Sequence, residues 1–231
     1  MKSDQFVFTM KIELIPVIEI TNYDQDIATP VSGPYWKFPD DWEAYRIATN
    51  SKAEYSDQLR PYVKGSSFYK ISEINDEDLL KIIHKEIAIQ QTEENLGIDD
   101  LVSPFCGGYI LKIDDVDKYL PQCCGNLGNI EDWINLLEDE DPYFYMGHPS
   151  PRIKKTANKI IFDFLNSEIQ DPYVPPMLED QLEVDENALK IAIRDTKKQL
   201  DTFAKKLICI NNHENLNIPD IDKILIYGID N

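Results

Sequence analysis

The stretch FVFTMKIELIPVIEI, residues 6–20, alternates apolar and polar side chains and gives the clearest strand signal in the chain. Its even positions are all apolar: Phe6, Phe8, Met10, Ile12, Leu14, Pro16, Ile18 and Ile20. Successive side chains of a strand point to opposite faces, so this period of two predicts a strand with one buried face and one mostly wet face. Pro16 has no amide hydrogen, so we expect the strand to run along a sheet edge there or to break in two.

Helices and further strands are expected to follow this first strand. Polar caps predict helices from Asp41 to about Thr49, after Asn75, after Asn129 and from about Asp185. Short apolar runs predict strands at residues 68–74, 108–113, 116–121, 143–146, 159–165 and 221–227, with a hairpin turn at residues 114–115. Strands in adjacent pairs with helices between them predict an α+β fold, with a mixed, mainly antiparallel sheet and helices packed on one face. Because no linker interrupts the chain, we expect residues 1–231 to form a single α+β domain.

The last predicted helix carries an apolar seam whose members are spaced 4, 3, 4, 3, 4 and 3 residues apart. They are Leu189, Ile193, Thr196, Leu200, Phe203, Leu207 and Ile210. One such seam suits a core helix lying across a sheet, which is the interpretation we favour. The alternative is a homo-oligomer held together by a coiled coil over Leu189–Ile210.

Acidic residues dominate the composition, with 42 Asp plus Glu against 23 Lys plus Arg and a formal net charge of -19. A surface this negative repels nucleic acid and anionic lipid and attracts basic partners. The first residues do not read as a signal peptide, and no apolar run reaches the length of a membrane span. We therefore expect a cytoplasmic protein, without nucleic-acid or membrane partners, whose four cysteines are reduced thiols.

Catalytic signatures are sparse. A thiolate nucleophile needs a nearby base, so Cys123 or Cys124 with His148 is the one pair that fits a small cytoplasmic hydrolase or transferase. Cys106 could join these three in a zinc site, but the Cys-x-x-Cys and His-x-x-x-His spacings of such sites are missing. We expect no catalytic site, no metal and no cofactor, and we keep the Cys–His enzyme as the alternative.

The acids are concentrated in two blocks that contain no Lys or Arg. One block lies between Lys118 and Arg152, and the other between Lys159 and Lys190. The first contains four consecutive carboxylates followed closely by aromatic residues, and we assign six of its members to a partner-binding site: Glu138, Asp139, Glu140, Asp141, Tyr143 and Tyr145. Acids steer a basic partner, and tyrosines are enriched at binding hot spots. The alternative is a solvated turn before a strand whose aromatic side chains belong to the core.

Three segments carry a resemblance to a known family. They are PFCGGYIL at 104–111, LPQCCG at 120–125 and GHP at 147–149, within about 45 residues of the chain. Together they resemble bacterial α+β immunity proteins, which neutralise polymorphic toxins. The resemblance and the charge imply an acidic, non-enzymatic interaction module that binds and occludes a basic protein partner such as a toxin or effector.

Overall fold

The computed structural model describes residues 10–94, 103–140, 142–167 and 171–228. These residues form strands, helices and one short 3₁₀ helix, in the order β1 (Ile12–Glu19), α1 (Pro39–Lys52), β2 (Phe68–Lys70), α2 (Asp76–Glu94), β3 (Gly107–Ile113), β4 (Val116–Tyr119), η2 (Leu127–Asn129), α3 (Ile130–Glu138), β5 (Arg152–Thr156), β6 (Lys159–Asp163), β7 (Gln181–Asp185), α4 (Glu186–His213) and α5 (Ile221–Tyr227). The mixture of helices with antiparallel strands confirms the α+β class.

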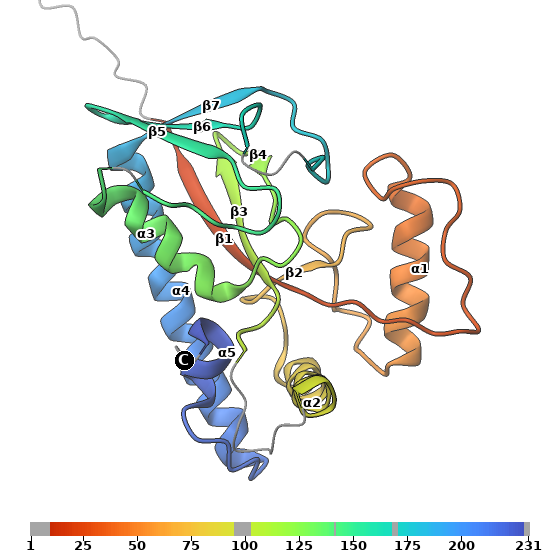
Figure 1. Cartoon of the computed structure of the whole chain (residues 1–231). Helices are drawn as coiled ribbons and strands as arrows, with labels where there is room; N and C mark the ends of the chain where they lie inside the picture. Colours follow the sequence, from red (N-terminus) through yellow and green to blue (C-terminus); the bar gives the residue numbers. More distant parts are fainter. Residues whose placement is uncertain (1–9, 95–102, 141, 168–170, 229–231) are drawn as a thin grey trace, which may run out of the picture.

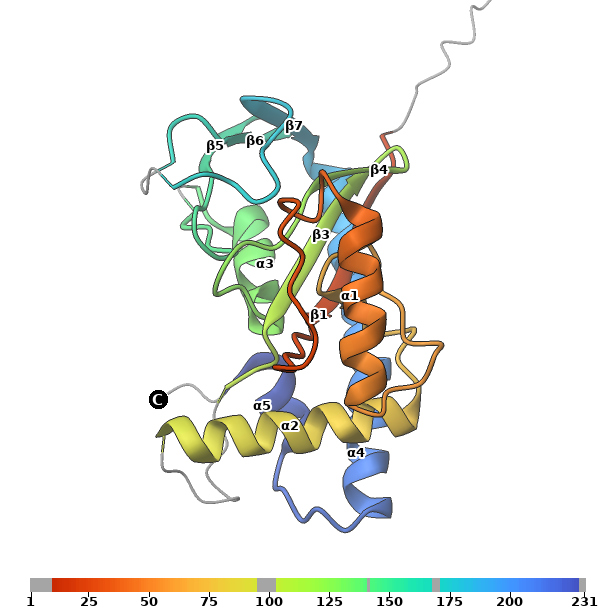
Figure 2. The ribbon, with the colours of Figure 1, turned by 90° about the vertical axis from the view of Figure 1, so that its right-hand side faces the viewer.

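Two antiparallel sheets stand where the sequence predicted one. The larger has the strand order β2-β1-β3-β4 and the smaller β5-β6-β7. Figure 1 shows α3, α4 and α5 on one side of β1 and β3, with the smaller sheet above them. Figure 2, turned by 90°, shows α1 in front of the same strands, so α1 stands beyond the opposite face.

Strand β1 is a central strand, neither an edge nor broken at Pro16. It pairs with β3 from Ile12 to Ile18, and with β2 only from Val17 to Glu19. The Pro16 carbonyl oxygen accepts a hydrogen bond from the Ile71 amide (3.3 Å), but its nitrogen has no hydrogen to return. Pairing with β2 therefore ends beside the proline, and the predicted strand 68–74 shortens to Phe68–Lys70. Residues 6–9 of the predicted first strand lie outside the described residues.

The face of β1 expected to be mostly wet is buried in its middle. Ile15 and Val17 join a small apolar cluster with Phe68, Ile110 and Leu120, covered by Tyr62 and Val63. Only the ends of the strand follow the prediction, because Glu13 is half-buried and Glu19 exposed. Both faces of the middle of β1 are therefore covered by other parts of the chain, which requires apolar residues on both.

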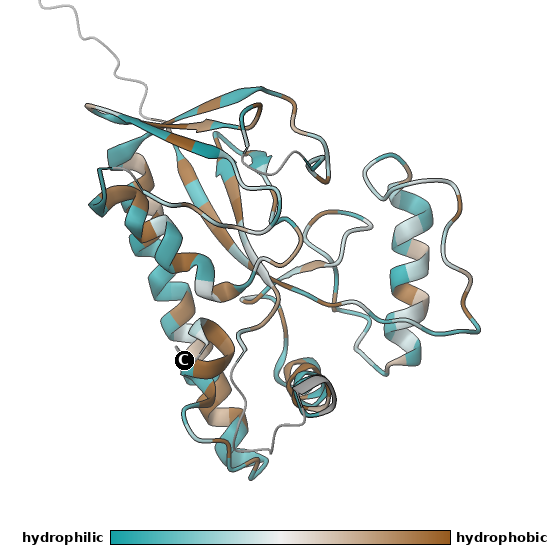
Figure 3. Cartoon of the chain, viewed as in Figure 1, coloured by the Kyte–Doolittle hydropathy of each residue, from teal (hydrophilic) through white to brown (hydrophobic). Residues whose placement is uncertain are grey.

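Helix α4 packs along β1 with its seam inward. All seven seam residues are buried, and they belong to the main apolar core with Leu14 and Ile18, apart from Thr196, which is the polar position. In Figure 3 the hydrophobic positions gather along β1, β3 and α5, while α4 shows a mixed pattern. The core-helix interpretation is confirmed, because the seam packs against the chain's own sheet.

Two predicted strands are wrong. Residues 221–227 form the helix α5, whose buried residues Ile221, Ile224 and Leu225 follow helical spacing against α4. A seven-residue apolar run fits a strand or a buried helix equally well, so the period alone does not decide. Residues 143–146 form no strand and end in a bend at Met146. Conversely, β5 was not predicted, because its sequence RIKKT carries three cations in five residues.

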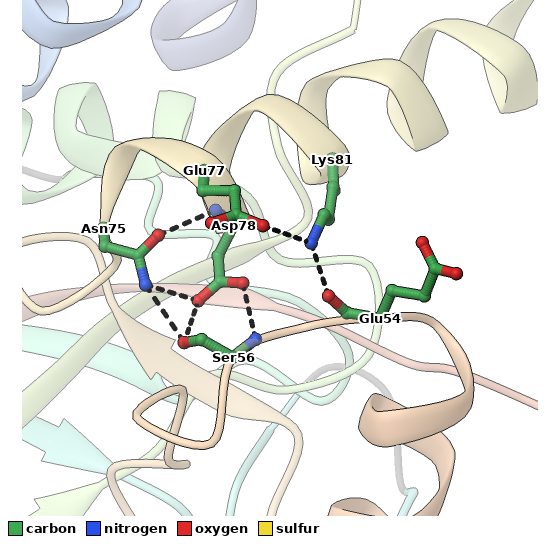
Figure 4. Close-up of polar contacts among 6 residues, drawn as sticks. All are labelled: Glu54, Ser56, Asn75, Glu77, Asp78 and Lys81. Carbon is green, nitrogen blue, oxygen red and sulfur yellow. Dashed lines mark hydrogen bonds and ion pairs between the residues drawn. The ribbon is translucent and has the colours of Figure 1, made fainter.

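The predicted Asn75 cap is confirmed and belongs to a buried network (Figure 4). The Asn75 side-chain oxygen accepts the Asp78 amide at 2.8 Å, as an N-cap does. The fully buried Asp78 carboxylate accepts hydrogen bonds from the Ser56 amide (2.8 Å), the Ser56 hydroxyl (2.5 Å) and the Asn75 amide group (2.6 Å). The network ties the segment after α1 to the first turn of α2. Nearby, the Lys81 ammonium bonds to Glu77 (2.9 Å) and to the Glu54 carbonyl oxygen.

Candidate functional site

The first acidic block lies at the carboxyl end of α3. Helix α3 buries Ile130, Trp133 and Leu136, which holds its opposite side outward. Glu138 is the last helical residue, and Glu138, Asp139 and Glu140 are all exposed. Within the described part of the chain, none of these three carboxylates makes a hydrogen bond or ion pair. Asp141 lies outside the described residues.

Lys155 of β5 approaches this end of α3 without neutralising the carboxylates. Its ammonium group donates to the Asp139 carbonyl oxygen at 2.7 Å and to the Leu137 carbonyl oxygen at 3.3 Å. The carbonyl oxygens at the end of a helix carry partial negative charge and lack helical partners, so a lysine there stabilises the helix end. The acidic side chains themselves stay free for another partner.

The aromatic segment after the acids alternates between core and solvent. Phe144 is 4% exposed and Met146 fully buried, whereas Tyr143 is 70% exposed and Tyr145 half-buried. Phe144 stands edge-on to Trp133, with ring centroids 4.9 Å apart, and the Trp133 indole N–H points at the Met146 sulfur. The two inward residues therefore anchor a segment in which Tyr143 points outward and Tyr145 stays partly exposed. The alternative of core aromatics holds for Phe144 alone.

Asp132 is a positioning residue that the sequence prediction did not identify. Its carboxylate accepts a hydrogen bond from the Asn129 amide group (3.1 Å) and faces the Tyr145 backbone. Burial raises the pKa of the Asp132 carboxyl above its ordinary value, and the Asn129 amide group and the Tyr145 backbone offset part of that rise. The contact links the start of α3 to the tyrosine segment. In the sequence, the spacing of Asn129 and Asp132, three residues apart at a predicted helix start, is the signal that could have identified Asp132.

Four of the seven described acids of the second block bind partners within the protein. Glu179 pairs with Lys118 at 2.6 Å, and Glu183 pairs with Lys159 at 2.5 Å. The Asp185 carboxylate accepts the Ala188 amide at 2.8 Å and caps α4, as expected of an acid at a helix start. Asp163 is fully buried and bonds to Lys154 at 3.0 Å. These four acids contribute to the fold, whereas Asp171, Asp180 and Glu186 have no side-chain partner among the described residues.

The three segments that carry the family resemblance meet in space. The Gly107 amide donates to the Gly125 carbonyl oxygen (2.8 Å), and the His148 amide donates to the Cys123 carbonyl oxygen (2.8 Å). Gly147 allows this approach: a Cβ atom there would lie 2.5 Å from the backbone oxygens of both Gln122 and Cys123. The glycines therefore permit backbone contact that side chains would prevent.

The convergence brings the predicted Cys–His pair together. Cys123 and His148 face each other across an isolated antiparallel bridge, and the His148 ring lies 5.1 Å from the Tyr145 ring. The Cys123 sulfur contacts the sulfur of Cys124 at 3.3 Å, and no bond joins it to the imidazole within the described residues. That thiol contact raises the pKa of Cys123 above its ordinary value, which disfavours the thiolate.

No cluster of three or more His, Cys, Asp or Glu side chains is arranged to hold a metal ion in the described ranges. None of the described helices is both long enough and apolar enough to cross a membrane. No family model, curated protein or solved structure matches this chain.

Proposed function

We propose that the protein is a non-enzymatic interaction module that binds a basic protein through Glu138, Asp139, Glu140, Tyr143 and Tyr145, called here the acid–tyrosine surface. One observation carries the proposal. The three described carboxylates of this surface have no partner among the described residues, whereas four of the seven described acids of the second block are bound within the protein. Free carboxylates beside an exposed tyrosine suit a partner rich in Lys and Arg.

The position of the acids supports binding over helix stability. Negative side chains at the carboxyl end of a helix oppose its dipole, typically by about 0.3–1 kcal/mol each. Lys155 offsets this cost through the carbonyl oxygens, but the carboxylates contribute nothing to α3 that neutral residues would not. Their concentration at this point therefore favours a role outside the fold.

The finer proposal is an immunity or inhibitor protein that occludes a basic toxin or effector. The carboxylates would engage the Lys and Arg side chains that the effector uses on its own substrate, and Tyr143 would supply the desolvated centre of the interface. The resemblance of residues 104–149 to immunity proteins supports this function. A cytoplasmic location belongs to the same proposal, because all four cysteines are free thiols.

A capture experiment with the tagged protein in host lysate, at low and moderate salt, supplies the partner. Association is then measured for Glu138→Gln, Asp139→Asn and Glu140→Gln combined. The matched control combines Asp57→Asn, Asp171→Asn and Asp201→Asn, which removes the same charge from exposed acids elsewhere.

We expect the first variant to slow association at low salt by tenfold or more, and the control to have a much smaller effect. The difference should shrink as salt rises, because exposed charges are screened over about 8 Å at physiological ionic strength. Equal association rates for the two variants would refute the assignment of this surface.

The alternative function is a Cys–His hydrolase or transferase. The bridge between Cys123 and His148 is the observation in its favour. An activated thiolate reacts quickly with iodoacetamide near neutral pH. Rapid, selective labelling of Cys123 or Cys124 in the native protein would favour the enzyme, and uniformly slow labelling would remove it.

A further inference from the structure

Two adjacent thiols point the same way at the surface. Neighbouring side chains in extended backbone point to opposite faces, and Cys123 is extended because it pairs with His148. Cys124 has φ +68°, which turns its side chain back beside that of Cys123. The result is a sulfur–sulfur distance of 3.3 Å between two exposed thiols.

This arrangement is held in place although it is locally unfavourable. A non-glycine residue in the left-handed region is strained, and such outliers gather at functional positions. Backbone hydrogen bonds hold it in place. The Gly125 amide donates to the Gln122 carbonyl oxygen (3.1 Å) and closes a turn. The Gly107 amide donates to the Gly125 carbonyl oxygen, and the His148 amide donates to the Cys123 carbonyl oxygen. The two sulfurs are therefore preorganised to act together.

The separation of the sulfurs selects the kind of atom that can bridge them. Consider an atom bonded to both sulfurs at about 2.3 Å, the length of a metal–thiolate bond. With the sulfurs 3.3 Å apart, the sulfur–atom–sulfur angle at that atom is about 92°. That angle falls well short of the tetrahedral geometry of zinc. It matches the pyramidal bonding of trivalent arsenic, which carries a lone pair and prefers bond angles near a right angle.

We infer that Cys123 and Cys124 form a dithiol site for monosubstituted trivalent arsenicals. The site needs only two sulfurs, because the third bond of the arsenic belongs to its organic group. Cys124 lies near enough to Cys106 to contribute, after burial, to the raised pKa of the Cys106 thiol, but no sulfur contact joins the two within the described residues. The inference is independent of the acid–tyrosine surface and of any partner.

The reaction is a condensation that needs no oxidant. With phenylarsine oxide, both S–H bonds break, two As–S bonds form, and the arsenic-bound oxygen leaves as one molecule of water. Arsenic and sulfur keep their oxidation states. The second As–S bond closes within the same molecule, so its high effective concentration makes the chelate far more stable than an adduct with one thiol.

The experiment exposes the reduced full-length protein to one equivalent of phenylarsine oxide, followed by a wash with excess 2-mercaptoethanol. A monothiol strips adducts held by one cysteine and leaves the chelate. We expect the intact mass to show one phenylarsenic group per chain, released by 2,3-dimercaptopropanol. Proteolytic mapping of the wild-type adduct should place the arsenic on the peptide that holds both cysteines, which requires no variant.

Four single variants identify the sulfurs. Cys123→Ser and Cys124→Ser should each lose the washed adduct completely, while Cys106→Ser and Cys209→Ser should keep it. Circular dichroism of each variant verifies the fold. An unmodified wild-type protein, an adduct surviving in Cys123→Ser or Cys124→Ser, or loss in Cys106→Ser would each overturn the inference.

Discussion

The Thr196 hydroxyl of α4 donates a 2.7 Å hydrogen bond to the Leu14 carbonyl oxygen of β1, across 182 positions of sequence. The hydrogen bonds from Ile20 to Ser67 and from Ile71 to Pro16 show that the even residues of β1 direct their backbone groups toward β2. Because β2 ends beside Pro16, the Leu14 carbonyl has no strand partner on that side. The one polar residue of the α4 seam fills the place of the missing strand.

Replacing this hydroxyl should destabilise the protein. Thr196→Val keeps the shape of the side chain but leaves a buried carbonyl oxygen without a donor, so we expect a loss of about 1–3 kcal/mol in the free energy of unfolding. Thr202→Val is the matched control: Thr202 is exposed and bonds only within its own helix, to the Lys198 carbonyl oxygen. Urea unfolding of both variants measures the difference. Equal stabilities would mean that the hydrogen bond contributes nothing.

Local sequence patterns predicted the elements whose signals are complete within a few residues. The Asn75 cap lies three residues before the Asp78 amide that donates to it, and the Asp114-Asp115 turn takes positive φ at both positions, as a tight hairpin requires. The 4-3 seam of α4 likewise repeats within one helix. Such signals depend on backbone geometry and side-chain period, both of which the sequence shows directly.

Other features depend on partners that are distant in sequence. The charged strand β5 forms because it pairs with β6, and α5 is helical because its apolar side packs on α4. At the site, the alternation of Tyr143, Phe144 and Tyr145 was visible in the sequence as an aromatic run. The internal pairing of the second acidic block was not, since Lys118 lies 61 residues from Glu179.

The hydrogen bonds of the buried Asp78 carboxylate should contribute strongly to the stability of the fold (Figure 4). Asp78→Asn replaces one of the two acceptor oxygens with an NH2 group, which then faces either the Ser56 amide or the Asn75 amide group and Ser56 hydroxyl, so we expect a loss of about 1–3 kcal/mol in the free energy of unfolding. Glu77→Gln, on the next residue, removes only an exposed pair with Lys81 and should cost less than about 1 kcal/mol. Chemical unfolding at neutral pH compares the two. A larger loss for Glu77→Gln would contradict the assigned roles.

Asp163 should give the stability a specific dependence on acid. Hydrogen bonds from Asn166, together with Lys154, lower the pKa of the fully buried Asp163 carboxyl from 3.8 to about 2. A lowered folded-state pKa contributes stability above the unfolded-state value, and this contribution is lost as the pH falls from about 4 toward 2. The free energy of unfolding of the wild type should therefore exceed that of Asp163→Asn most at neutral pH. This difference should become smaller as the pH falls from about 4 toward 2.

The measurement for Asp163 is urea unfolding at several pH values between 2 and 7, expressed as the difference between wild type and Asp163→Asn. Taking the difference cancels the titration of the other acids. Asp180→Asn serves as the control, because Asp180 is a nearby exposed acid without a side-chain partner among the described residues. A gap between wild type and Asp163→Asn that stays constant over this range would show that the carboxylate does not titrate as inferred.

Gly147 should be indispensable to the loop that carries the thiols. An alanine there combines φ +90° with a Cβ placed 2.5 Å from the Gln122 and Cys123 carbonyl oxygens, neither of which belongs to a flexible side chain. Gly108→Ala is the control, because Gly108 has φ +135° but its Cβ would meet only ordinary contacts, the nearest at 3.4 Å. Both variants bear backbone strain of roughly 1–2 kcal/mol, so a larger loss in the unfolding free energy of Gly147→Ala isolates the effect of the steric clash.

The clash in Gly147→Ala should also break the hydrogen bond from the His148 amide to the Cys123 carbonyl oxygen. Iodoacetamide should then label Cys123 at a changed rate, while the labelling rate of Cys209 stays the same. Equal losses for the two alanine variants, with unchanged labelling, would mean that the approach of the two segments does not depend on Gly147.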